Sequence, residues 1–286
     1  MGKYTENLKE RILTRGNKEG YCVICGEWGP LSRDHVPPKG CNNLSDAEIR
    51  FLHPPQGIER KPVTSQGGVT YRTLCGACNS GRLGTEYDPA LIEFSNAITN
   101  RSLVARERRL ALPQFVQHYI KPQRIARAIV GHVIAALAVD ESKDGLRSDP
   151  MTDKMRHYFL NQDAPLPEQI EIYFWLYPER KQIVVKHMGK MVQVEDGSND
   201  IIKGHIIKFL PFGFWLTYDS PSMKAHNIHN LIKQSSLGID DLDLVSLNIY
   251  DVPPLNFPEA PEGNQLMMYN SNYGTQSKPK LKKSRR

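Results

Sequence analysis

The chain has 286 residues, of which 40% are hydrophobic and 24% charged, an ordinary globular composition with length for one large domain or two smaller ones. Its net charge of +6 suits a polyanionic partner. The start lacks the apolar segment of a secretory signal, and the most apolar stretch, Ile125 to Val139, is too short to span a bilayer. We therefore expect a cytoplasmic protein without a membrane partner.

The first hundred residues show short elements broken by turns. Apolar spacing predicts a short helix at residues 5–15, and the stretch from Val23 to Leu31 suits a small hairpin. Residues 42–68 hold several prolines and a Gly-Gly pair, which favours a long, partly irregular inserted loop. Val69 to Leu74 alternates and predicts a strand. Asp88-Pro89 is a good helix start, because Asp can cap a helix and Pro fits its first position.

A second region begins near residue 101. Apolar residues at four-residue steps predict a core helix from Gln123 to Val139. Strands are predicted at Ile170–Leu176, Gln182–Met188, Ile201–Leu210, Phe212–Tyr218 and Leu242–Tyr250. The last residues are polar, rich in proline and end in a basic run, which is typical of disorder. We therefore predict an α+β protein with a mostly antiparallel sheet, divided into residues 1–100, residues 101–255 and a disordered basic tail at 256–286.

Five cysteines are present, and four of them form two Cys-x-x-Cys pairs, Cys22/Cys25 and Cys75/Cys78. Two intervening residues let both thiolates of a pair bind one zinc ion at about 2.3 Å in a tetrahedral site. A closed site of four thiolates has no open position, so this zinc would be structural. The alternative is that the two pairs are unrelated or redox-active. Cys41 is left over and is expected to be a small packed residue.

The dipeptide Asp34-His35 follows the first cysteine pair. A carboxylate can bind a hard cation such as Mg²⁺ or Mn²⁺, and that cation can stabilise charge on a phosphate and on its leaving oxygen. A neutral imidazole can deprotonate a water molecule near neutral pH. The alternative for such a dipeptide is a turn with a capping Asp and a surface His.

Three motifs in order, Cys-x-x-Cys, Asp-His-x-x-Pro and Leu-Cys-x-x-Cys-Asn, cover roughly residues 20–90. Together they resemble the HNH (ββα-metal) endonucleases, in the branch with a zinc-stabilised, treble-clef-like frame. The resemblance implies a zinc-bound nuclease module in residues 1–100 that hydrolyses phosphodiester bonds in nucleic acid, with DNA favoured. It also implies that His35 is the general base and that Asp34 and Asn79 bind the catalytic Mg²⁺ or Mn²⁺.

Two positions depart from the family pattern. Thr70 stands where the family has its middle Asn, and Asn79 stands where many members have the final His. Glu86 and Asp88 are candidates for a further carboxylate at the metal, although Asp88 serves equally well as a helix cap. His53, in the inserted loop, is a weaker candidate for the same site.

Four basic residues surround the proposed site and are candidates for phosphate contacts, the alternative being solvated charge: Arg33, Lys39, Arg72 and Arg82. We favour Lys39 and Arg72. Members of the family occur as homing, restriction, phage-defence and toxin nucleases, and a role in phage defence or as an effector is favoured by elimination. Residues 101–255 would then select substrate, bind a protein partner or regulate the nuclease. Two other hypotheses stay open: a non-catalytic zinc module that binds nucleic acid or a partner protein, and an interaction protein that regulates a partner ATPase or nuclease.

Overall fold

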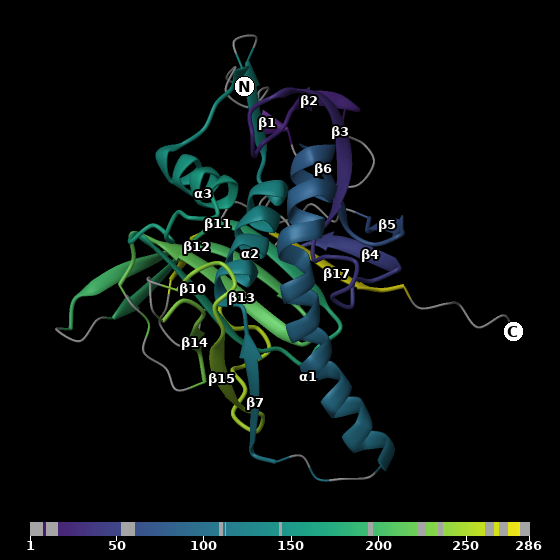
Figure 1. The fold of residues 1–286 in the computed structure, drawn as a ribbon, viewed down its shortest axis with the longest axis vertical. Helices are drawn as coiled ribbons and strands as arrows, with labels where there is room; N and C mark the ends of the chain where they lie inside the picture. Colours follow the sequence, from purple (N-terminus) through teal and green to yellow (C-terminus); the bar gives the residue numbers. More distant parts are fainter. Residues whose placement is uncertain are drawn as a thin grey trace, which may run out of the picture.

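The computed structural model describes residues 8–9, 17–52, 61–108, 111, 113–142, 145–193, 197–221, 223, 227–233, 237–260, 266–268 and 274–280. It is an α+β fold with few helices, and every pair of described strands runs antiparallel (Figure 1). The helices are η2 (Ala77–Tyr87, a π-helix), α1 (Asp88–Arg108), α2 (Pro122–Ala136) and α3 (Pro150–Leu160).

The strands are β1 (Leu8–Lys9), β2 (Glu19–Tyr21), β3 (Trp28–His35), β4 (Asp46–Phe51), β5 (Val63–Gln66), β6 (Thr70–Cys75), β7 (Phe115–Ile120), β8 (Val139–Ser142), β9 (Gly145–Leu146), β10 (Ile170–Leu176), β11 (Gln182–Gln193), β12 (Asn199–Phe209), β13 (Phe212–Tyr218), β14 (His229–Asn230), β15 (Asp243–Asn248), β16 (Met267–Met268) and β17 (Gly274–Pro279).

The largest sheet has nine strands in the order β14-β10-β13-β12-β11-β17-β4-β5, with β16 paired to β11. Side chains alternate between its two faces, because successive strand residues point in opposite directions. Phe174 and Phe214 face the helices and join the main core, whereas Trp175 and Trp215 face the other side and form a second core. The sheet is therefore buried on both faces.

Helices α1 and α2 lie side by side against the first face of this sheet (Figure 1). Pro122 stands in the first turn of α2, where the missing N–H is not needed. Gly131 allows a close approach, since a Cβ there would lie 2.6 Å from a ring carbon of Phe159. From α1, the ring of Phe94 stacks on Phe212 of β13 at 4.3 Å between centroids. The helices thus link the sheet to the rest of the molecule.

A smaller three-stranded sheet, β2-β3-β6, leads directly into η2. In the β3–β6 pair, His35 lies opposite Thr70 and Leu31 lies opposite Cys75, with an irregularity between Ser32 and Asp34. We call β2, β3, β6 and η2, with the loop between β2 and β3, the hairpin region. This region carries all four paired cysteines.

Several sequence predictions are confirmed. Strands β10 and β13 have the predicted bounds, and β6, β11, β12 and β15 overlap their predictions. Helix α2 covers most of the predicted core helix. The helix start predicted at Asp88 is wrong, because η2 runs without a break into α1 and the Asp88 N–H donates to the Leu83 carbonyl. The short helix expected at residues 5–15 is wrong at Leu8–Lys9, which pair with β8 as a strand; the rest of that prediction lies outside the described residues.

Three predictions about organisation are corrected. The inserted loop 42–68 contains β4 and β5, because Ala47 and Ile49 turn toward the core and the backbone completes the large sheet. Residues 274–280 of the expected disordered tail include β17, which pairs with β11 on one side and β4 on the other. Backbone hydrogen bonds and small buried side chains hold this polar strand. The expected boundary at residue 100 falls inside α1.

Candidate functional site

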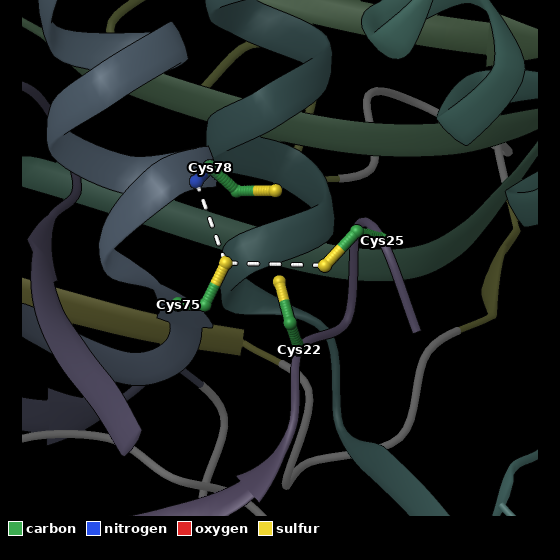
Figure 2. Close-up of side chains that lie close together, drawn as sticks. All are labelled: Cys22, Cys25, Cys75 and Cys78. Carbon is green, nitrogen blue, oxygen red and sulfur yellow. Dashed lines mark hydrogen bonds between the residues drawn. The ribbon is translucent and has the colours of Figure 1, made fainter. Parts of the chain in front are cut away.

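The four paired cysteines come together (Figure 2). Cys22 and Cys25 lie in the loop between β2 and β3, while Cys75 ends β6 and Cys78 lies in the first turn of η2. Gly26 has a φ of +77° and donates its N–H to the Cys22 carbonyl at 2.8 Å, which closes the tight turn of the first pair. The four sulfur atoms lie within 4.8 Å of one another.

The sulfur geometry fits a zinc ion. The Sγ atoms of Cys25 and Cys75 are 3.9 Å apart, close to the edge of about 3.8 Å that a tetrahedron with Zn–S bonds of about 2.3 Å would have. All of these thiols are free, so they are not joined as disulfides. Burial raises the pKa of Cys25 to about 11, whereas a hydrogen bond from Cys78 lowers the pKa of Cys22 to about 5. A bound cation would favour the thiolate form of all four.

Cys41 is buried outside this cluster, as expected for a small packed residue. Burial raises the pKa of its thiol to about 12. Among the residues that the structure describes, the four paired cysteines are the one group of three or more His, Cys, Asp or Glu side chains arranged to hold a metal.

Asp34 is buried and points toward α2, with only 3% of its surface exposed. Its Oδ2 accepts a hydrogen bond from His132 Nδ1 at 3.1 Å, and His132 Nε2 donates to Asp88 Oδ1 at 2.9 Å. Burial alone would lower the pKa of His132, but the two carboxylates outweigh it and raise that pKa to about 10. Both ring nitrogens face carboxylate oxygens, an arrangement that favours the imidazolium form.

His35 is the next residue along β3 and so points to the opposite face of the strand. Its Nε2 lies 3.0 Å from the carbonyl oxygen of Gly67, which can only accept, so Nε2 is the donor and Nδ1 is left as an acceptor. Gly67 and Gly68 have φ values of +95° and +91°, a backbone region that favours glycine. This Gly-Gly turn is what brings the carbonyl to the imidazole.

Asn79, in the first turn of η2, reaches back to β3. Its Nδ2 donates to the Arg33 carbonyl at 3.0 Å and to Ser32 Oγ at 2.9 Å. Ser32 Oγ in turn donates to the Leu74 carbonyl at 2.9 Å. No hydrogen bond to Asn79 Oδ1 is found among the described residues. The side chain is thus fixed through its nitrogen, with its oxygen unassigned.

The structure therefore brings some of the expected site residues together and separates others. Asn79 contacts Arg33, the residue just before Asp34. The described hydrogen bonds of Asp34 and His35 run to other partners, on opposite faces of β3. Thr70 is buried opposite His35, and the backbone carbonyl of Gly67 makes the contact to the imidazole.

The remaining candidates have varied surroundings. Arg33 and Lys39 are exposed, whereas Arg72 is only 8% exposed within β6. Arg82 donates to the Leu160 carbonyl, and Glu86 accepts a hydrogen bond from Gln162 at 2.6 Å. Asp88 binds His132. His53 lies outside the described residues. Of these basic candidates, Arg33 and Lys39 are therefore the exposed ones near Asp34-His35.

Sequence reasoning missed His132 and Gly67. His132 is a core residue with two carboxylate partners. Its position within an apolar helix was a usable signal, because a buried imidazole needs polar partners. Gly67-Gly68 was expected only as part of a loop, although two adjacent glycines often mark a turn with positive φ.

No family model, curated protein or solved structure matches the chain. Over the described residues, no helix combines the length and the apolar character needed to cross a bilayer.

Proposed function

We propose that this chain is a metal-dependent endonuclease of the HNH type, which hydrolyses phosphodiester bonds in nucleic acid, with DNA favoured. The observation that carries the proposal is the hydrogen bond from Asn79 to the Arg33 carbonyl, which fixes the start of η2 beside Asp34-His35. An antiparallel strand pair followed at once by a helix, both tied to a four-cysteine cluster, is the arrangement that such a module needs. It supports the proposal through the spatial arrangement of the residues that carry the sequence motifs.

The zinc at the four cysteines is structural in this proposal. Four thiolates close the coordination sphere, so this ion has no open position for substrate. It would join the β2–β3 turn to the end of β6 and the start of η2. Metal binding then contributes folding free energy to this region in addition to its buried apolar side chains.

Asp34 and Asn79 have the chemistry to bind a second metal ion, a hard cation. Asp34 uses Oδ2 for His132, and no hydrogen bond to its Oδ1 is found among the described residues. Asn79 likewise has an unassigned amide oxygen. Mg²⁺ commonly takes one or two protein oxygens and completes its sphere with water and phosphate. When bound, such a cation would stabilise charge on the phosphate and the leaving oxygen.

His35 is the general base in this proposal. Its Nε2 donates to the Gly67 carbonyl, which fixes the ring and leaves Nδ1 to accept a proton from water. Arg33 and Lys39 are exposed nearby and would contact phosphates, which makes binding weaken as salt rises. The net charge of +6 acts in the same direction over longer distances.

The test is a nicking assay on supercoiled plasmid with Mg²⁺ or Mn²⁺. We expect His35→Ala to slow cleavage by about a hundredfold or more, the usual range for loss of a general base. His157→Ala is the matched control, because His157 is exposed on α3 and should leave the rate unchanged. Cleavage by His35→Ala at the parent rate would refute this mechanism.

A non-catalytic zinc module that binds nucleic acid or a partner protein is the second candidate. The observation that favours it is the burial of Asp34, whose carboxylate already binds His132. This alternative expects metal-independent binding to nucleic acid and no nicking with either cation. Binding measured by fluorescence anisotropy beside the nicking assay separates the two candidates.

A further inference from the structure

His132 joins three separate parts of the chain. It lies on α2, is 1% exposed, and contacts Asp34 of β3 and Asp88 at the start of α1. Asp34 and His132 are 98 residues apart in sequence. Apart from Arg127, the other buried residues of the helix from Ile125 through Val133 are apolar or glycine. An apolar side chain would fill this space without requiring two buried carboxylates.

The two hydrogen bonds of the His132 ring orient different groups. The bond from Nδ1 occupies one oxygen of Asp34 and so sets the rotation of that carboxylate. The bond from Nε2 to Asp88 fixes the ring itself. A carboxylate that binds a metal is commonly held by a hydrogen-bond partner of this kind, and removal of the partner typically weakens metal binding by about 10- to 100-fold.

We propose that His132 is a positioning residue, which holds Asp34 through Nδ1 so that the other carboxylate oxygen is presented to a hard divalent cation. This inference rests on the proposed nuclease function. It adds that α2, beyond the segment with the HNH-like motifs, completes the site. Asp88 acts one step further away, because it orients the imidazole ring. The hairpin region alone would then lack a properly oriented cation ligand.

Two isosteric variants distinguish this role from a general need for packing. In His132→Asn the amide nitrogen stands about where Nδ1 stands, so it can still donate to Asp34. In His132→Gln the amide nitrogen stands about where Nε2 stands, so it can donate to Asp88 but not to Asp34. Both variants lose one of the two buried hydrogen bonds, and both remove the imidazole.

The experiment measures Mn²⁺ binding to the full-length, zinc-loaded chain by electron paramagnetic resonance, without nucleic acid. We expect His132→Asn to bind Mn²⁺ within about threefold of the parent and His132→Gln to bind about 10- to 100-fold more weakly. The Mn²⁺ concentration for half-maximal plasmid cleavage should shift in the same order. Zinc content and melting temperature, measured on both variants, report folding separately.

Each outcome has a defined meaning. Equal Mn²⁺ affinities for the two variants, whether higher or lower than that of the parent, would overturn the positioning role. The nuclease proposal would still stand if the parent cleaves. A parent that neither binds Mn²⁺ at millimolar concentration nor nicks plasmid would overturn both. Weakened binding by His132→Gln alone, at unchanged zinc content, supports the role.

Discussion

The hairpin region and the nine-stranded sheet are stabilised in different ways. The sheet is packed on both faces by large side chains, with Phe94, Phe174 and Phe212 on one face and Trp175 and Trp215 on the other. The hairpin region adds side-chain hydrogen bonds and the four thiols to its apolar contacts, since Leu74, Leu83 and Tyr87 are buried in the main core. The candidate site therefore depends on polar contacts and metal in addition to apolar burial, whereas the large sheet depends mainly on apolar burial.

Helices α2 and α3 connect the two regions. Thr73 of β6 donates to the Ala135 carbonyl at the end of α2 at 2.7 Å. Arg156 of α3 donates to the Val23 carbonyl, inside the first cysteine pair, at 2.6 Å. With His132, these contacts attach the hairpin region to a rigid support through directed bonds. The two regions also share the main core, but the sheet has a second core on its far face, so we expect the sheet to stay folded when the hairpin region is damaged.

Zinc removal should have the largest effect. Structural zinc sites supply free energy on the order of 10 kcal/mol, so a strong chelator, or Cys22→Ser, should unfold the hairpin region. Hydrogen exchange should become fast at residues 20–35 and 70–80 while β10 and β13 stay protected. Cys41→Ala is the matched control, because Cys41 is buried outside the cluster and should retain zinc. Equal loss of protection in the sheet would contradict the separation of the two regions.

The converse experiment destabilises the sheet, by Trp215→Ala, and leaves the hairpin region unchanged. Trp215 is fully buried on the sheet face away from the helices, near Phe257, and truncation of such a side chain costs about 3–5 kcal/mol. Urea denaturation should show this loss in the free energy of unfolding. Under native conditions zinc content should match that of the parent, and loss of zinc from the folded variant would show that the two regions are coupled more tightly than the contacts suggest.

A smaller effect is expected at the turn that contacts His35. A Cβ at Gly68 would lie 2.5 Å from Asn43 Oδ1, and the φ of +91° is strained for any other residue, so Gly68→Ala should cost about 1–3 kcal/mol. Because the turn carries the Gly67 carbonyl, plasmid nicking should fall more than stability alone predicts. Gly29→Ala, in β3 with open space around the Cβ, is the control. A variant as active as the parent would show that this carbonyl does not orient the imidazole.

How far the sequence predicted these features depends on the range of the interactions. The four-cysteine cluster follows from spacing, since each pair is local and only the meeting of the pairs is long-range. Strands β10 and β13 are rich in aromatic and β-branched residues and had the predicted bounds. Strand β17 is polar and is defined by backbone pairing with β11 and β4, so composition suggested disorder. Nothing local marks the partners of His132, because Asp34 lies 98 residues away and Asp88 lies 44 residues away.

The smallest predicted effect is a dependence of stability on pH that arises in the sheet and not in the hairpin region. His205 is buried in the sheet, and its Nδ1 accepts from the backbone N–H of His187 at 3.3 Å. Burial first, and then nearby His187, lower its pKa well below 6.5, although Asp149 opposes this shift and Lys186 adds to it. Below pH 6.5 the unfolded chain therefore binds a proton that the folded chain does not. The free energy of unfolding is then full above pH 6.5 and falls below it, by at most about 1.4 kcal/mol per pH unit.

His205→Asn removes this titration and keeps an acceptor for the His187 N–H, because its Oδ1 can stand about where Nδ1 stands. We expect the free energy of unfolding of the parent to fall relative to the variant as pH drops from 7 to 5.5, and the difference to be constant above pH 7. Zinc thiolates also take up protons at low pH, but they do so equally in both proteins. The difference between the two curves therefore reports the sheet alone, and parallel curves would show that His205 does not contribute to the acid sensitivity of this region.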